Sequence, residues 1–230
     1  RSQFLNQFQK KIPRLWTRKT SVSIKGQMDF AFQHLIEEYD FAPIFQSDEF
    51  FSKLPFSEEL EEMIKIFLEE LSEFDLENLE GDFIGRMYQE LIPLKEKKNL
   101  GQIYTPEEIA KLMVDISVKS PDSLVLDPAC GCGTFLREIY LRQKTLLRQQ
   151  GKSMSGFRLH QKLLEQIWGV EINNFPAHLS MMTLTFMNLS SFSDLVGVLL
   201  HDFLDMGPME KYNVKTKNLR TGAIMTRDMP

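Results

Sequence analysis

The stretch LDPACGCGTF, residues 126–135, constrains the fold of this chain more than any other part of its sequence. A short apolar run ends at Asp127, two glycines follow at Gly131 and Gly133, and a helix is expected to begin near Thr134. Glycines let a ligand approach the main chain, and a helix N-terminus offers free N–H donors. The stretch therefore predicts the strand, loop and helix that open a nucleotide-binding α/β unit.

The charges in this turn restrict the ligand. A helix N-terminus favours a carboxylate or a phosphate, whereas an acid at the end of the strand repels a phosphate and attracts an ammonium group. A ligand that carries both charges fits best. The dinucleotide fingerprint needs a third glycine at position 136, where this chain has Leu136, so the sequence does not favour a dehydrogenase.

Two further strands are predicted downstream, each followed by an acid. Residues 167–170 form the second strand, with Trp168 in the core, and Glu171 stands at its end, suited to accept hydrogen bonds from ribose hydroxyls. The third predicted strand ends at His201 and Asp202. Because parallel strands place their carboxyl ends on one edge of a sheet, Asp127, Glu171 and Asp202 are expected to converge on one crevice.

The segment TPEEIAKLMVDIS precedes the first strand and predicts a helix. Thr105 is a candidate N-cap, Pro106 suits the first turn, and Glu108 completes a capping box. Apolar residues then recur at helical spacing and predict a buried stripe: Ile109, Leu112, Met113 and Ile116.

The character of the chain changes near residue 97. Before it, residues 28–39 and 58–71 show helical periodicity, and the charged link LKEKKNL follows. The sequence predicts an α/β protein with an all-helical N-terminal domain over 1–97. An α/β domain with a parallel sheet is predicted over 98–230.

Composition excludes several classes of protein. A net charge of −5 and a pI near 5.5 argue against a stand-alone nucleic-acid binder. No window is apolar enough for a membrane helix, and Cys130 and Cys132 are poorly spaced for a disulfide or a metal site. We expect a cytoplasmic protein without a bound metal, and a chain that starts at Arg1 is expected to be processed or cut from something longer.

The motifs GQIYTP, LDPACGCGTF, GVEI and HDFL occur in this order between Asn99 and Asp205. In order and spacing they resemble the cofactor half of the DNA adenine-N6 methyltransferases, specifically the modification subunits of type I restriction systems. The resemblance implies a Rossmann-like methyltransferase domain with S-adenosylmethionine as cofactor. It also implies double-stranded DNA, a specificity subunit and, in a complete system, a restriction subunit as partners.

The resemblance further implies which residues bind the cofactor. The residues expected around its methionine end are Tyr104, Thr105, Pro106, Asp127, Ala129, Gly131, Gly133 and Thr134. Those expected around the nucleoside are Glu171, Ile172, Asp202 and Phe203. In this reading Glu171 holds the ribose, Ile172 packs on the adenine, Asp202 bonds the exocyclic amine and Phe203 covers an edge.

The catalytic residues of this family are not recognisable in the chain. Its members hold a flipped adenine with Asn, Asp or Ser followed by two prolines and an aromatic residue, and here no two prolines are adjacent. Residues 211–214, KYNV, resemble the start of the strand that carries this motif. We therefore expect weak or no methylation by the chain alone, through truncation, a gap in the chain or true loss of the motif.

Two other functions remain open on the sequence. The same fold and tetrapeptide also serve methyltransferases that act on a protein amide. The chain could instead be a non-catalytic assembly module whose helical domain binds a specificity subunit.

Overall fold

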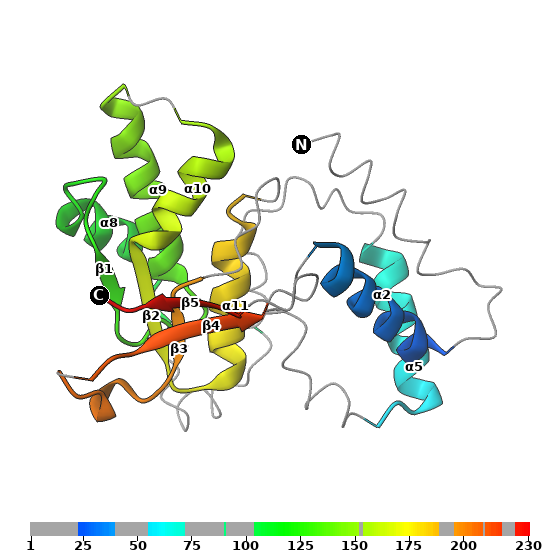
Figure 1. Ribbon diagram of the computed structural model, residues 1–230. Coiled ribbons are helices and arrows are strands. Elements are labelled where there is room, and N and C mark those ends of the chain that lie inside the picture. The colour runs from blue at the N-terminus through cyan, green and yellow to red at the C-terminus, as the bar shows by residue number, and fades with distance from the viewer. Residues whose placement is uncertain are drawn as a thin grey trace. The chain divides into compact units, whose positions relative to one another are not determined.

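The computed structural model describes residues 23–39, 55–71, 90, 104–151, 154–188, 196–208, 210–217 and 224–230. The chain divides into two compact units, one of residues 1–79 and 217–223 and one of residues 80–216 and 224–230 (Figure 1). The domain boundary predicted after residue 97 lies outside the described residues and stays a prediction. Among the described residues, no helix is both long enough and apolar enough to cross a membrane.

The first unit contains the two helices predicted near the N-terminus, α2 (Ile24–Tyr39) and α5 (Glu58–Leu71). Helix α5 begins with a side-chain cap, because the Ser57 hydroxyl accepts a hydrogen bond from the Leu60 N–H at 3.2 Å. Its first turn carries three glutamates, whose charge suits the positive end of the helix dipole. One of them, Glu61, accepts a hydrogen bond from the Ile24 N–H and so joins the start of α2 to α5.

The second unit is built on a three-stranded sheet whose strands are parallel, as the sequence predicted. The strand order is β1-β2-β3. The strands are β1 (Val125–Asp127), β2 (Ile167–Glu171) and β3 (Val198–Leu200). The helices of this unit are α8 (Glu107–Ser117), α9 (Thr134–Gln149), α10 (Gly156–Glu165) and α11 (Asn174–Phe186). This alternation of parallel strands and helices is a mixed α/β arrangement, consistent with part of a Rossmann-like methyltransferase fold (Figure 1).

The hydrophobic core of the second unit lies around β2. All five residues of β2 are buried, including Trp168, whose predicted place in the core is confirmed. Helices α9, α10 and α11 all pack against this strand. Their fully buried side chains include Leu136, Tyr140, Leu163, Leu164 and Leu184. Burying each aliphatic side chain stabilises the fold by about 1.5–3 kcal/mol, so the end of β2 is held firmly in place.

The predicted burial of one face of α8 is wrong. Ile109, Leu112, Met113 and Ile116 are 49–62% exposed, whereas Ala110 and Val114 are buried. Helix α8 packs on α9, and it does so through these smaller residues. The apolar surface of α8 therefore extends beyond the part of the helix that packs against α9.

The predicted capping box at the start of α8 is also wrong. The helix begins at Glu107, Pro106 is its N-cap residue, and no side chain caps it. The Pro106 carbonyl accepts hydrogen bonds from the N–H groups of Ile109 and Ala110, both at 3.0 Å. Pro106 has an extended ψ of 141°, so Thr105 lies outside the helix.

The C-terminal strands form a separate sheet. Strand β4 (Asn213–Lys217) includes the end of the KYNV segment and pairs with β5 (Ile224–Asp228), so it does not extend the parallel sheet. The Arg227 guanidinium of β5 stacks over the Trp168 ring at 4.1 Å from its centroid. This cation–π contact attaches the pair of strands to the start of β2.

Candidate functional site

The glycine loop, residues 128–133, joins β1 to α9. Gly131 has a φ of +53° and Gly133 a φ of +90°, in the left-handed region that residues with a Cβ rarely adopt. Helix α9 begins at Thr134, directly after Gly133. The strand, loop and helix predicted from LDPACGCGTF are confirmed, and backbone conformation explains why glycine stands at both positions.

Asp127 lies at the end of β1, and its two carboxylate oxygens have different surroundings. Oδ1 accepts a hydrogen bond from the Ala129 N–H at 3.1 Å. Oδ2 is buried and has no hydrogen-bond partner among the described residues. Burial raises the pKa of Asp127, the Ala129 N–H opposes this, and the charge of Glu171 raises the pKa further. A cation beside Oδ2 would relieve both the desolvation and the repulsion.

Glu171 lies at the end of β2, is 8% exposed and is well supplied with donors. Its Oε2 accepts a hydrogen bond from the Gly131 N–H at 3.0 Å. Its Oε1 accepts from the backbone N–H of Asn173 at 2.8 Å and from the Asn173 side-chain amide at 3.0 Å. A carboxylate offers about four acceptor positions, so three are used by the described residues and one remains among them.

Tyr104 connects the start of α8 to the glycine loop. Its ring packs over Gly131, where the Cε1 atom lies 3.1 Å from the position that a Cβ would take. Its hydroxyl lies 3.6 Å from the Cys132 sulfur. Thr105 is partly buried and Pro106 is exposed. The structure thus gathers Tyr104, Asp127 and Glu171 around the loop.

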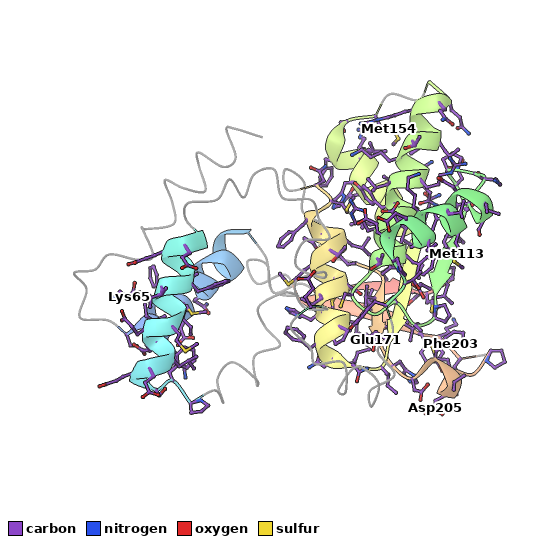
Figure 2. The ribbon with its side chains drawn as sticks, turned by 180° about the vertical axis from the view of Figure 1, so that it is seen from behind. Lys65, Met113, Met154, Glu171, Phe203 and Asp205 are labelled. Atoms are coloured by element: carbon purple, nitrogen blue, oxygen red, sulfur yellow. The ribbon has the colours of Figure 1, made fainter. Side chains whose placement is uncertain are left out.

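The residues predicted to bind the nucleoside lie at the ends of β2 and β3. The His201 N–H donates to the Glu171 carbonyl at 3.0 Å, so Asp202 comes one residue after the last link between the strands. The Asp202 carboxylate accepts a hydrogen bond from the Leu204 N–H at 2.9 Å. Ile172 is 60% and Phe203 40% exposed, so apolar surface is open at this edge. Glu171 and Phe203 are labelled in Figure 2. None of the described hydrogen bonds joins Asp202 to the glycine loop.

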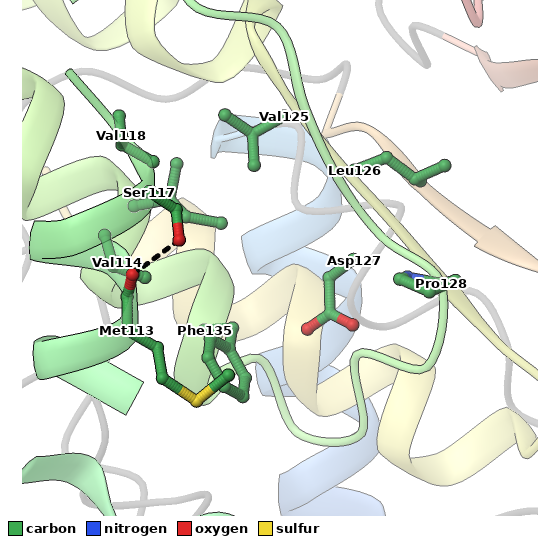
Figure 3. A pocket seen from close by; sticks show the side chains of 10 residues that line it. Met113, Val114, Ser117, Val118, Val125, Leu126, Asp127, Pro128 and Phe135 are labelled. Atoms are coloured by element: carbon green, nitrogen blue, oxygen red, sulfur yellow. Dashed lines mark hydrogen bonds between the residues drawn. The ribbon is translucent and has the colours of Figure 1, made fainter. Parts of the chain in front are cut away.

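A cavity of about 270 Å³ lies beside β1, between α8 and α9. Its lining is apolar apart from two residues, and consists of Met113, Val114, Ser117, Val118, Val125, Leu126, Asp127, Pro128, Phe135 and Ile139. Figure 3 shows the Asp127 carboxylate among these side chains, while the Ser117 hydroxyl donates to the Met113 carbonyl at 2.6 Å. Asp127 therefore borders both the glycine loop and this cavity.

Comparison with known proteins identifies the family. A family model described as N-6 DNA Methylase matches residues 79–204, more than half of the chain. The chain belongs to the N-6 DNA methylase family. Members of this family use S-adenosylmethionine and methylate adenine in DNA.

The matched relatives of this N-6 DNA methylase chain are methylase subunits. It is 39% identical over 83 residues to the MjaVII type I restriction enzyme methylase subunit of Methanocaldococcus jannaschii, covering 35% of this chain and 14% of that subunit. It is 30% identical over 117 residues to the EcoEI type I restriction enzyme methylase subunit of Escherichia coli, a match that covers 50% of this chain and 22% of that subunit. The chain thus spans less than a quarter of the length of these relatives.

Among solved structures, the chain resembles the DrdV–DNA complex at 18% sequence identity. The match covers 79% of this chain and 20% of that one, with a TM-score of 0.49. At that TM-score the likeness carries no argument about function.

Sequence reasoning missed several residues that support the candidate site. Asn173 supplies two donors to Glu171, and its position two residues after a strand-end acid could have revealed it. Ser180 and Thr183 of α11 donate to carbonyls of the glycine loop. Their signal is two hydroxyl residues three apart on a helix of largely apolar residues. Among the described residues, no group of three or more His, Cys, Asp or Glu side chains could hold a metal ion.

Proposed function

We propose that the second unit binds S-adenosylmethionine as the cofactor-binding part of a DNA adenine-N6 methyltransferase of a restriction-modification system. One observation carries the proposal. Within a chain of the N-6 DNA methylase family, the carboxylates of the half-buried Asp127 and the buried Glu171 stand at the ends of adjacent parallel strands, beside a loop with two left-handed glycines. Ligands of open α/β sheets bind at this edge.

The residues present fit the cofactor. S-adenosylmethionine carries an ammonium group, a carboxylate and a ribose, and supplies a methyl group on a positively charged sulfur. The buried Oδ2 of Asp127 suits its positive charge, since that oxygen has no hydrogen-bond partner among the described residues. The remaining acceptor position of Glu171 suits a ribose hydroxyl. Tyr104, with Thr105 and Pro106 beside it, would border the methionine end.

The nucleoside would lie along the ends of β2 and β3. Ile172 and Phe203 expose apolar surface there, which suits the two sides of an adenine ring. Asp202 would accept a hydrogen bond from the exocyclic amine of the ring. This requires that its Oδ2 face the ring, because Oδ1 is engaged by the Leu204 N–H.

Binding of the target adenine requires residues that the chain does not show. The Asn-Pro-Pro-aromatic motif, which accepts hydrogen bonds from the flipped base and stacks on it, has no counterpart in the sequence. Catalysis by positioning and hydrogen bonding depends on such a motif. We expect this chain to bind the cofactor and to transfer little or no labelled methyl to adenine by itself.

Calorimetry with S-adenosylmethionine tests the proposal. Asp127→Asn and Glu171→Gln keep the size of each side chain and remove its charge, and we expect each to weaken binding roughly tenfold to a hundredfold. Asp122→Asn is the matched control, because Asp122 is an exposed acid paired with Lys162 at the surface. Equal affinity in all variants, or no binding by a folded chain, would reject this site.

The partners are part of the same proposal. The MjaVII and EcoEI relatives are subunits of type I restriction enzymes, which supports assembly with a specificity subunit and a restriction subunit on double-stranded DNA. A longer form of the protein should bind duplex DNA with a steep salt dependence. If a folded chain assembles with a specificity subunit but binds no S-adenosylmethionine, it is an assembly module instead.

A further inference from the structure

Helix α11 holds the glycine loop by two side-chain hydrogen bonds. The Ser180 hydroxyl donates to the Gly131 carbonyl at 2.5 Å, and the Thr183 hydroxyl donates to the Cys132 carbonyl at 3.1 Å. Both side chains are buried, with 0% and 2% of their surface exposed. Residues three apart share one face of a helix, so α11 presents both hydroxyls to the loop together.

The loop lies very close to α11 at this point. A Cβ on Gly133 would approach the Ser180 Cα to 3.2 Å, so a side chain at position 133 would require the loop or the helix to shift by a few tenths of an ångström. The Cys130 sulfur lies 3.5 Å from the Ser180 oxygen. Burial raises the pKa of the Cys130 thiol to about 12, so the thiol is protonated at neutral pH. It can therefore donate to Ser180, whose own proton is directed to Gly131.

These bonds determine which way the loop peptides face. A trans peptide is planar, with its N–H opposite its C=O, and the described residues contain no cis peptide. When the Gly131 carbonyl is directed to α11, the Cys132 N–H of the same peptide is directed away from α11. If the hydroxyls are removed, the part-buried Gly131 carbonyl and the buried Cys132 carbonyl lose these donors. An unpaired carbonyl away from water is unfavourable, so rotation of the two peptides becomes more favourable.

We propose that Ser180 and Thr183 are positioning residues that set the peptide orientation of the glycine loop and thereby the affinity for S-adenosylmethionine. The proposal rests on the proposed function for its second half only. Its first half concerns the loop itself and can be measured without cofactor. Neither residue needs to touch the cofactor, because each acts through the loop carbonyl that it holds.

Helix α11 offers a matched control at Thr185. This residue is also a buried threonine, 6% exposed, but its hydroxyl donates to the Met181 carbonyl of its own helix at 2.8 Å. Thr183→Val and Thr185→Val thus make the same chemical change on the same helix, and only the first removes a bond to the loop. Thr183→Ser keeps the hydroxyl and serves as the rescue variant, and Ser180→Ala removes the second bond.

The experiment measures two quantities on the full chain and on each variant. Hydrogen exchange, followed by mass spectrometry of peptides that cover residues 128–134, reports the opening of the loop. Calorimetry reports the affinity for S-adenosylmethionine. We expect Thr183→Val and Ser180→Ala to accelerate exchange in the loop and to weaken binding about fivefold to tenfold. Thr185→Val and Thr183→Ser should leave exchange in the loop unchanged and affinity within about twofold.

The outcomes separate the two claims. If Thr183→Val and Thr185→Val have equal effects on both quantities, the proposal is overturned, because loss of any buried hydroxyl then explains the result. Faster exchange in the loop without a change in affinity overturns the second half. If the unaltered chain binds no cofactor, the proposed function and this second half fail together. Exchange in the loop still decides whether Ser180 and Thr183 hold it.

Discussion

Substituting Gly131 by alanine should separate backbone strain from contact with Tyr104. Gly131 has a φ of +53°, and Gly151 has a φ of +68°, so alanine is strained at either position. A left-handed conformation costs a residue with a Cβ about 1–2 kcal/mol. In a domain of this size, that corresponds to a fall in melting temperature of about 2–8 °C. Both variants should lose this much stability.

The two positions differ in what surrounds them. A Cβ at Gly131 would lie 3.1 Å from the Tyr104 ring, whereas a Cβ at Gly151 would meet no atom of the described residues within 4 Å. The Tyr104 ring must therefore shift by a few tenths of an ångström when Gly131 becomes alanine. We expect Gly131→Ala to weaken S-adenosylmethionine binding roughly tenfold or more, and Gly151→Ala to leave it within about twofold.

Thermal unfolding and calorimetry of four variants test this reasoning. Because of the Tyr104 contact, Gly131→Ala should lower the melting temperature further than Gly151→Ala does. This difference should disappear when Tyr104→Ala is added to both variants, because the ring is then absent. A difference that persists without the ring would show that the contact is not its cause. Equal cofactor affinities for Gly131→Ala and Gly151→Ala would refute the role given to the Tyr104 ring.

Three further changes have expected outcomes. Burial, and to a smaller extent the charge of Lys144, lowers the pKa of His160 from 6.5 to about 4. The free energy of unfolding that neutral His160 contributes is therefore fully present above pH 6.5 and is lost as the pH falls towards 4. Relative to His160→Gln, denaturant titrations should show a loss of about 3 kcal/mol over that window. S-adenosylmethionine affinity should fall on acidification through the raised pKa of Asp127, and Asp127→Asn should abolish that dependence. Arg137→Met should destabilise the chain by about 3–5 kcal/mol in urea unfolding, since it strips the buried Glu138 of its partner, and Arg137→Met with Glu138→Gln should recover most of the loss.

The parts of the fold that the sequence predicts well are those determined by neighbouring residues in the sequence. Strand β2 begins at Ile167, as predicted, and helix α9 begins at Thr134 after two glycines that the backbone requires. An acid directly after an apolar run marks the end of a strand, which is why Asp127 and Glu171 could be placed at one edge. Each of these signals extends over fewer than about ten residues.

The parts that sequence did not predict depend on contacts between distant residues. The hydroxyls of Ser180 and Thr183 bond to carbonyls that lie 49 and 51 residues away in the sequence. No local sequence pattern predicts which carbonyls accept these bonds. Periodicity placed four large apolar residues on one face of α8, Ile109, Leu112, Met113 and Ile116, but it does not say what packs against that face. The residues of α8 that are buried are Ala110 and Val114, whose smaller side chains allow the helix to pack closely on its neighbour.

The two strand-end carboxylates, Asp127 and Glu171, have different hydrogen-bond environments and are therefore suited to bind different groups. Glu171 uses three acceptor positions on the protein itself, one of them on the Gly131 N–H, so its negative charge already stabilises the loop. Asp127 receives one donor and keeps a buried oxygen without a partner among the described residues, at the cost of a raised pKa. A cationic group that enters the loop therefore gains most from Asp127, while a neutral hydroxyl is sufficient for Glu171. This difference supports the proposed orientation of the cofactor, with its positively charged group near β1 and its ribose near β2.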